Sequence, residues 1–254
     1  METWRTAIVE ASADSIRVRG YDIAALMRGA SFADLIFLLH RGRLPAAGES
    51  ALLNAILVSA ADHGPGAPSC AAARLAASGN RESLSAAVAA GVLAIGNEHG
   101  GAGAAAMEMI AAGVALAGRE GLSLTAAAER TVAEARAAGR RLPGLGHRVH
   151  RTDPRTQVLF DMAAEQRVAG AGVEFFTALQ AAAGRLIGPL PINIDGALAA
   201  VLHDLGFPPE AGKLIFIIAR VAGLTAEVAE EHAREKPMRI RIPVTYDGPP
   251  PRSL

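Results

Sequence analysis

Histidines next to glycines are the feature of this sequence that most directly indicates chemistry. Three of the seven histidines, His63, His99 and His147, sit beside glycines in the loop-like strings DHGPG (62–66), GNEHGGAG (96–103) and LPGLGHRVHRTDPR (142–155). Glycine beside an imidazole leaves room for a ligand to approach the ring and the backbone N–H groups. A neutral histidine donates a hydrogen bond, and near pH 7 it also passes a proton. One such histidine is often a surface residue, but three in similar settings indicate a shared site.

An acid and two arginines fall where they could join that site. Asp195, in NIDG (193–196), follows an apolar turn and precedes a predicted helix, where an acid alone is more often a helix cap. The string TDPR predicts a helix start from which Arg155 projects. Arg220 ends the apolar string LIFIIAR, where an unpaired charge is costly, so we expect an acid or a bound anion beside it.

Two rival motifs predict other chemistry. GAGAAA (101–106) satisfies a loose G-x-G-x-x-A dinucleotide pattern with Glu120 nearly twenty residues on, which would indicate a dehydrogenase. That pattern requires a preceding strand, whereas residues 86–96 are rich in alanine and predicted to be helical. His147 and His150 could form a metal pair, but no H-E-x-x-H motif accompanies them. We therefore expect neither a nicotinamide cofactor nor a metal.

Helices must position these groups, because alanine is abundant and aromatic residues make up only 4% of the chain. The string FADLIFLLH (32–40) follows Ser31, a favoured N-cap, and stops before Gly42. Further helices are predicted at 49–61, 67–77, 81–95, 102–117, 124–138, 155–168, 172–183, 195–204, 209–222 and 225–235. Strand character is limited to 6–9, 15–19 and 239–246. The predicted fold class is mostly α.

Composition excludes several classes of protein. The 25 basic residues balance 25 acidic ones, so no excess positive charge exists to bind nucleic acid. No apolar run is long and uncharged enough to span a membrane, and the first residues carry no recognisable targeting signal. Cys70 is the single cysteine, which excludes an internal disulfide and favours a cytoplasmic protein.

The length of 254 residues suits one large domain or two small ones. Clusters of glycine or proline near Gly100–Gly103 and Gly206–Pro209 interrupt helices and are possible boundaries. The proline-rich end, DGPPPRSL (247–254), forms neither regular helix nor strand, so we expect it to run over the surface.

The ordered set DHG, EHGGA, PGLGHRVHRTDPR, NIDG and AR-x-x-G resembles the citrate synthase superfamily. The match runs from about Phe32 to about Tyr246, and five strings in the right order with compatible spacing make it specific. The chain lacks the long N-terminal portion of ordinary citrate synthases, and it has Gly196 where they usually have phenylalanine. Within the superfamily it therefore looks more like citryl-CoA lyase and the lyase module of ATP-citrate lyase.

The resemblance implies a citrate synthase-like, mostly helical homodimer with an active-site cleft between two domains in each chain. The larger helical domain would comprise 1–100 and 207–254, and the smaller, CoA-binding domain 101–206. The implied chemistry is a reversible Claisen-type step that joins acetyl-CoA and oxaloacetate as citryl-CoA. Coenzyme A thioester is then a substrate, and no metal is required.

The resemblance also implies roles for individual residues. Asp195 would remove a proton from the acetyl methyl group or return it, and His99 would donate a hydrogen bond to the thioester oxygen. His147 would protonate or polarise the oxaloacetate ketone and accept the alkoxide proton during cleavage. The carboxylate-binding residues would be His63, Arg155 and Arg220. The CoA-binding residues would be Pro143, Gly144, Leu145, Gly146 and Arg151.

Two departures from the family pattern concern substrate binding. The interval from His147 to Arg155 is one residue shorter than in many citrate synthases, which affects the CoA-binding loop. Family members usually supply a further arginine across the dimer just before a proline, whereas here Ile242 precedes the proline. Arg241 or Arg239 is the candidate for that residue.

Physical chemistry supports the three central roles independently. A C–H bond beside a thioester is a very weak acid, so a base alone is insufficient. Proton transfer by a positioned side chain contributes about 10²–10⁴-fold, and a fixed donor to the developing oxyanion adds roughly 2.7–4 kcal/mol. An acid–base pair and a hydrogen-bond donor are therefore the minimum set, and Asp195, His99 and His147 supply them.

These considerations leave three hypotheses. The first is a citryl-CoA lyase-like enzyme that converts citryl-CoA to acetyl-CoA and oxaloacetate. The second is a short citrate or 2-methylcitrate synthase, which would also hydrolyse the CoA ester of the condensation product. The third is a non-catalytic subunit that binds CoA esters without turnover, although retention of His99 argues for a competent enzyme.

Overall fold

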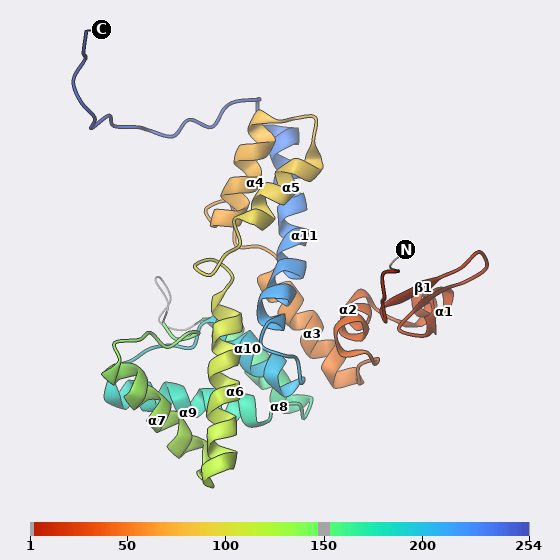
Figure 1. Cartoon of the computed structure of the whole chain (residues 1–254), viewed down its shortest axis with the longest axis vertical. Coiled ribbons are helices and arrows are strands. Elements are labelled where there is room, and N and C mark those ends of the chain that lie inside the picture. The colour runs from red at the N-terminus through yellow and green to blue at the C-terminus, as the bar shows by residue number, and fades with distance from the viewer. Residues whose placement is uncertain (1–2, 147–152, 254) are drawn as a thin grey trace.

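The chain is almost entirely helical in a computed structural model that describes residues 3–146 and 153–253. The short strands are β1 (Val9–Ala11), β2 (Ile16–Val18) and β3 (Tyr21–Asp22). The helices are α1 (Ile23–Gly29), α2 (Phe32–Arg41), α3 (Ala47–Ala60), α4 (Pro68–Gly79), α5 (Leu84–Leu93), α6 (Ala102–Glu120), α7 (Leu124–Ala137), α8 (Pro154–Glu165), α9 (Ala171–Leu186), α10 (Ile194–Asp204) and α11 (Ala211–Arg234). The mostly α prediction is confirmed (Figure 1).

The main hydrophobic core surrounds α10. Every residue from Gly196 to Leu202 is buried, so this helix is covered on all sides rather than on one stripe. Helices α6, α8 and α9 pack against it, and Phe175 and Phe176 of α9 are fully buried in the same core. Because α10 begins at Ile194, the residues of its first turn are held on a rigid element.

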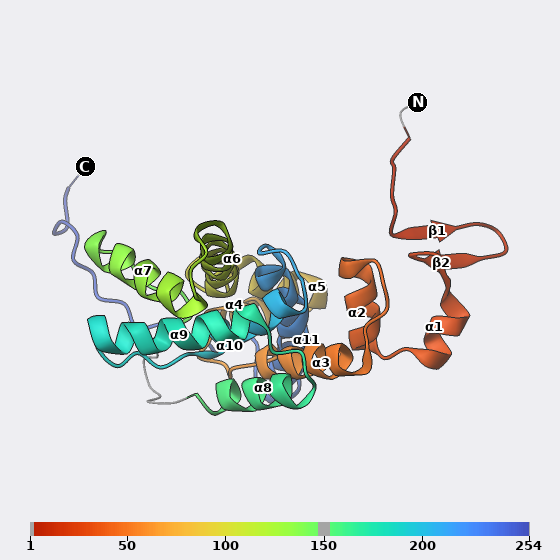
Figure 2. The same cartoon turned by 90° about the horizontal axis from the view of Figure 1, so that it is seen from below.

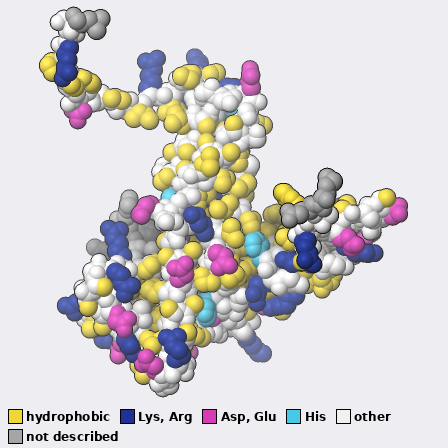
Figure 3. Space-filling view, viewed as in Figure 1, with side chains coloured by type: hydrophobic (Ala, Val, Ile, Leu, Met, Phe, Trp, Pro, Cys, Tyr) yellow, Lys and Arg dark blue, Asp and Glu magenta, His cyan; other side chains and the backbone are white. Residues whose placement is uncertain are grey.

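A second, smaller core joins α4, α5 and the C-terminal half of α11, which form the upper column in Figure 1. Small residues allow the close approach: a Cβ added to Gly91 would lie 2.9 Å from the Ser69 carbonyl oxygen. The outer face of the column is apolar where Figure 3 shows it, and exposed leucines include Leu75, Leu84 and Leu93. That apolar face is unusual for a surface that meets only water.

The N-terminal strands form an antiparallel ribbon that projects from the rest of the chain in both Figure 1 and Figure 2. Val9 pairs with Val18, and Val18 also pairs with Tyr21. The strands predicted at 6–9 and 15–19 therefore exist, shortened and shifted as β1 and β2. Neither β3 nor α1 was predicted from the sequence. The N-cap of α1, Asp22, accepts a hydrogen bond from the backbone N–H of Ala25 at 3.0 Å.

Two predictions about the C-terminal part were wrong. The segments 209–222 and 225–235 form one helix, α11, because Gly223 does not interrupt it but packs closely against the Ala61 carbonyl. The segment 239–246 is not a strand, since no neighbouring strand pairs with it in the described part of the chain. Its side chains are largely exposed, as Ile242 and Val244 illustrate.

Segment 94–101 links α5 to α6 without regular structure and carries His99. The larger and smaller domains predicted on either side of it stay a prediction. In the described residues, no helix has both the length and the apolar character needed to cross a bilayer.

Candidate active site

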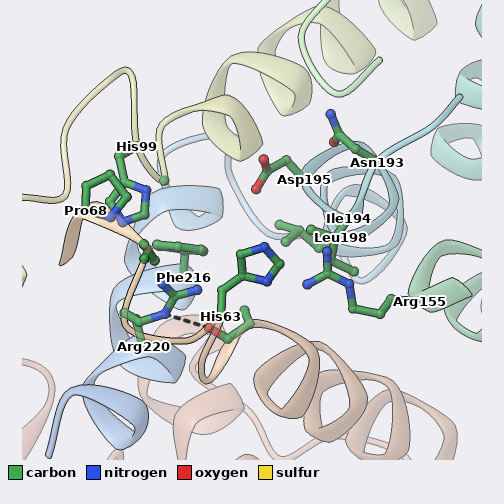
Figure 4. Close-up of a pocket in the computed structure, with 14 residues that line it drawn as sticks. His63, Pro68, His99, Arg155, Asn193, Ile194, Asp195, Leu198, Phe216 and Arg220 are labelled. Carbon is green, nitrogen blue, oxygen red and sulfur yellow. Dashed lines mark hydrogen bonds between the residues drawn. The ribbon is translucent and has the colours of Figure 1, made fainter. Parts of the chain in front are cut away.

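A pocket of about 490 Å³ brings together five residues that the sequence analysis singled out. They are His63, His99, Arg155, Asp195 and Arg220, which come from five separate segments of the chain. Figure 4 shows their side chains around one space, with the Asp195 carboxylate directed into it. Apolar walls come from Leu198, Phe216 and neighbouring small residues.

One helix end holds both arginines of the pocket. Arg155 Nη1 donates to the Ser59 carbonyl at 3.2 Å, and Arg220 Nε donates to the Ala60 carbonyl at 3.1 Å (Figure 4). These carbonyls belong to the last turn of α3, where backbone acceptors lack helical partners and the helix dipole is negative. Two guanidinium groups are thereby anchored to the same end of α3, just before the DHG turn, and Figure 4 shows His63 between them.

Arg220 is buried, with 4% of its surface exposed. Besides the Ala60 carbonyl, it donates to Ser69 Oγ at 3.3 Å and lies over the Phe216 ring, 4.8 Å from its centroid. These acceptors are neutral, and the described residues offer no carboxylate within ion-pairing distance of it. Since a buried guanidinium is costly without an anion, the pocket is suited to a negatively charged ligand.

Asp62 is an acid that interacts electrostatically with Arg220. Burial raises the pKa of its carboxyl group, but hydrogen bonds from the Cys70 thiol and the backbone N–H groups of His63 and Gly64 outweigh burial and lower it. Arg220 lowers that pKa further. Asp62 therefore stays ionised and orders the turn that carries His63, while its hydrogen bonds are satisfied locally.

His99 is held as a neutral imidazole. Its Nε2 lies 3.3 Å from the backbone nitrogen of Ser69 and 2.9 Å from Ser69 Oγ. A backbone N–H only donates, so Nε2 accepts and the ring proton belongs on Nδ1. Burial lowers the pKa of His99, and the positive charge of Arg220 lowers it further. The ring is therefore a neutral donor at pH 7, as the proposed hydrogen bond to a thioester oxygen requires.

Asp195 is not the helix cap that its position alone suggests. Asn193 is the N-cap of α10 and accepts a hydrogen bond from the backbone N–H of Gly196 at 3.1 Å. Asp195 instead occupies the first turn, where the helix dipole favours a negative charge. The sequence signal for this was present, because asparagine is an excellent N-cap and lies three residues before Gly196.

Hydrogen bonds join the glycine-rich loop, residues 143–146, to the segment that leads into α10. Gly146 N–H donates to the Pro191 carbonyl at 2.7 Å, and Asn193 N–H donates to the Gly144 carbonyl at 3.0 Å. The Asn193 side-chain amide donates to the Gly146 carbonyl at 2.8 Å. Gly144 and Gly146 both have positive φ angles, 82° and 90°, which favour glycine.

Pro143, Gly144, Leu145 and Gly146 do not line the pocket itself, and Pro143 borders a different cavity of about 640 Å³ between α6 and α7. Their CoA-binding role stays a prediction. His147 and Arg151, like His150, lie outside the described residues. Arg241 is exposed in the C-terminal segment and does not line the pocket of its own chain, and Arg239 pairs with Glu231 and Glu235.

Ser69 and Asp153 are the residues of the site that sequence reasoning missed or undervalued. Ser69 touches both His99 and Arg220, but nothing in the string APSC signals this. Asp153 is the N-cap of α8, as predicted, and it also pairs with Arg155. The rival dinucleotide pattern finds no support, since the helix α5 rather than a strand precedes GAGAAA.

A match to a protein-family model shows which family the chain belongs to. The model described as citrate synthase, C-terminal domain, matches residues 47–241. The chain belongs to the citrate synthase family. The citrate/2-methylcitrate synthase of Bacillus subtilis is 30% identical over 225 residues, which cover 86% of this chain and 57% of that protein. The 2-methylcitrate synthase of Shewanella oneidensis is 28% identical over 226 residues. The chain thus spans about half the length of the curated citrate synthase relatives that it matches.

Superposition on solved structures shows which members of the citrate synthase family share this fold. The citryl-CoA lyase from Hydrogenobacter thermophilus superposes with a TM-score of 0.92 at 40% identity, covering 100% of this chain and 98% of that one. An ATP citrate lyase from Methanothrix soehngenii, in complex with citrate and coenzyme A, gives a TM-score of 0.80 at 21% identity. It covers 98% of this chain but 42% of that one, and at this identity it shows the fold alone. The citrate synthase-like fold predicted from the motifs is confirmed.

Proposed function

We propose that this protein is a citryl-CoA lyase-like enzyme that cleaves citryl-CoA to acetyl-CoA and oxaloacetate. The observation that carries the proposal is the pocket in which Asp195, His99 and two arginines converge from distant segments. The similarity to citryl-CoA lyase over nearly the full length of both chains supports this choice within the family.

The reaction breaks the carbon–carbon bond between the carbinol carbon and the methylene group beside the thioester. The hydroxyl proton passes to a base, for which His147 is the candidate carried over from the resemblance. The bond's electron pair moves to the thioester oxygen, where the Nδ1–H of neutral His99 stabilises the enolate. Asp195, which enters this step protonated, gives its proton to the methylene carbon, which becomes the acetyl methyl group. The proton taken from the hydroxyl group then restores protonated Asp195 by way of solvent, so that no net proton is gained or lost. No step needs a metal or an oxidant.

Binding of the carboxylates falls to His63, Arg155 and Arg220 in this scheme. Both arginines keep N–H groups beyond those used on the α3 carbonyls, and a guanidinium binds a planar carboxylate with paired hydrogen bonds. A carboxylate ligand would also supply the anion that buried Arg220 requires. The substrate class is therefore a CoA thioester that carries several carboxylates.

The direct experiment follows oxaloacetate release from citryl-CoA. We expect turnover by the unchanged protein and a loss of about 10²-fold or more in the Asp195→Ala variant, because proton transfer by a positioned side chain contributes on that scale. Turnover no higher than that of Asp195→Ala would overturn the proposal. Circular dichroism of both proteins controls for folding.

A second candidate is a short citrate or 2-methylcitrate synthase, favoured by the names of the relatives that are about 30% identical. Mixing oxaloacetate with acetyl-CoA or propionyl-CoA separates the two, since a synthase releases free CoA and a pure lyase releases little. A non-catalytic CoA-ester-binding subunit would bind acyl-CoA without exchanging the acetyl methyl protons with solvent.

We also propose that the protein is a cytoplasmic homodimer with a large and a small domain. The exposed leucines of α4 and α5 support a partner surface, and the exposed C-terminal segment that carries Arg241 supports a contribution to the second copy's site. Sedimentation equilibrium tests the dimer. A monomer at micromolar concentration would contradict it.

A further inference from the structure

Asp153 and Arg155 form a bidentate ion pair at the edge of the pocket. Arg155 Nε donates to Asp153 Oδ1 at 3.0 Å, and Nη2 donates to Oδ2 at 2.8 Å. The Asp153 side chain is 1% exposed, whereas that of Arg155 is 28% exposed and lines the pocket. Two parallel charge-assisted hydrogen bonds fix the plane of a guanidinium as well as its position.

The Ser59 carbonyl anchors the same guanidinium from another helix. This carbonyl accepts a hydrogen bond from Arg155 Nη1 at 3.2 Å. The guanidinium of Arg155, which lies in the first turn of α8, is therefore held by α3 as well as by the N-cap of its own helix. Of the five N–H bonds of an arginine, three are directed in this way to protein acceptors in the described residues. One N–H on each terminal nitrogen is left for a ligand in the pocket.

We propose that Asp153 is a positioning residue, whose carboxylate holds Arg155 so that its two remaining N–H groups meet a substrate carboxylate. The identity of that substrate rests on the proposed function, but the ligand class is a small di- or tricarboxylate. Asp153 does not line the pocket, whereas its partner Arg155 does, so Asp153 influences a ligand there through Arg155. A guanidinium that is already ordered loses less conformational freedom when the ligand arrives.

The Asp153 carboxylate has two functions that the experiment must separate. It holds the Arg155 guanidinium, an arrangement called the clamp below, and it caps α8, because Oδ1 also accepts a hydrogen bond from the backbone N–H of Arg155 at 3.1 Å. Asparagine and serine are comparable N-caps, so Asp153→Asn and Asp153→Ser keep the cap of α8 while removing the bidentate carboxylate. Asp22→Asn is a matched control, since Asp22 caps α1 with a similar bond to Ala25 and lies outside the pocket.

The experiment measures citrate binding by calorimetry in the unchanged protein, Asp153→Asn, Arg155→Met and the double variant. We expect Asp153→Asn to weaken binding about tenfold, in line with the loss of one hydrogen bond to a charged group. The double variant should bind no more weakly than Arg155→Met, because the clamp has nothing left to position. Asp153→Ser should match Asp153→Asn, and Asp22→Asn should match the unchanged protein.

Chemical rescue supplies a readout that a merely structural residue would not move. Guanidinium ion added to the Arg155→Ala variant should restore part of the citrate affinity, and the added Asp153→Asn change should abolish that rescue. Additive losses in the double variant, or rescue that is independent of Asp153, would overturn the positioning role.

The same proteins separate this inference from the proposed function. Coupled citrate binding without turnover of citryl-CoA supports the clamp and overturns the lyase. Turnover with additive effects supports the lyase and overturns the clamp. An unchanged protein that binds no citrate overturns both the clamp and the assignment of the pocket to carboxylates.

Discussion

Gly144 and Gly196 touch backbone to backbone, so that the glycine-rich loop rests directly on the first turn of α10. A Cβ added to Gly196 would lie 2.5 Å from the Gly144 carbonyl oxygen and 2.5 Å from Cε1 of Phe176. A Cβ added to Gly144 would in turn lie 2.6 Å from the Gly196 Cα. The contact explains why a glycine follows Asp195 in this chain: a side chain there would push the loop away.

We therefore expect Gly196→Ala to lower both stability and activity. Overpacking a closed contact costs about 1–3 kcal/mol, and the displaced first turn carries Asp195. Urea unfolding and citryl-CoA turnover measure the two effects. Gly184→Ala is the matched control, because Gly184 is an exposed glycine within α9 whose added Cβ meets nothing within 4 Å. The control should be neutral or stabilised by up to about 1 kcal/mol. If the two variants were equally stable, the glycine-rich loop would move aside at no cost in free energy, and the prediction would be wrong.

Ser69→Ala tests the hydrogen bond that orients His99. The change removes the hydroxyl contacts to His99 Nε2 and Arg220 but leaves the backbone N–H of residue 69 in place. We expect kcat to fall about tenfold, which corresponds to about 1.4 kcal/mol, the scale of one hydrogen bond. Steady-state kinetics with citryl-CoA provide the measurement, and Ser85→Ala on the exposed face of α5 is the control. An unchanged kcat in Ser69→Ala would mean that the backbone N–H alone orients the ring.

Whether a feature of the fold or the site could be predicted from the sequence depends on how far apart along the chain its interacting residues lie. Local signals sufficed where a cap and a breaker lie within a few residues, as at α2, where Ser31 and Asp34 form a reciprocal capping box and Gly42 ends the helix. Short motifs also indicated the pocket, because the glycine-flanked histidines and NIDG occur together in a recognisable order, although each string alone has an ordinary structural explanation. The pairing of Ser69 with His99 joins residues thirty positions apart, and no local pattern encodes it.

Tertiary packing also overrode local propensity in α11. Gly223 lies where a helix break was predicted, yet the helix continues because its missing side chain lets the Ala61 carbonyl approach. The segment 239–246 shows the opposite case, since alternating apolar residues favour a strand that forms only when a neighbouring strand pairs with it. Sequence periodicity predicts the tendency, and the fold determines whether a partner is present.

The pKa of His99 predicts how activity responds to acid. Burial, followed by the charges of Arg220 and His63, lowers this pKa below the ordinary value of 6.5. The neutral donor form should persist as the pH falls through 6.5, and kcat should decline only below that value. The unfolded chain binds this proton more readily, so the contribution of His99 to stability is lost as the pH falls below 6.5. Nitrogen-15 NMR of the imidazole, assigned with His99→Gln, measures the titration. A midpoint at or above 6.5 would contradict the neutral-donor role.

A buried charge cluster between α4 and α11 should govern the stability of the upper column. Arg74 pairs with Glu227, Glu230 and Glu231, and the Glu231 side chain is fully buried. Although burial lowers the pKa of Arg74, hydrogen bonds to Glu227 and Glu230 raise it overall, so the arginine stays charged. Arg239 would still pair with Glu231 and Arg234 with Glu230, but Arg74→Met would leave the buried Glu227 carboxylate without its counter-charge. We expect a loss of about 3–5 kcal/mol in the free energy of unfolding.

Thermal and urea unfolding of Arg74→Met measure that loss, and a surface pair provides the comparison. Arg17→Met breaks an exposed pair with Glu10, which should cost no more than about 1 kcal/mol. Adding Glu227→Gln to Arg74→Met removes the carboxylate that has lost its counter-charge and should recover part of the stability. If Arg74→Met were as mild as Arg17→Met, water would have to reach Glu227 readily, and the upper column would be less tightly packed than its small-residue contacts imply.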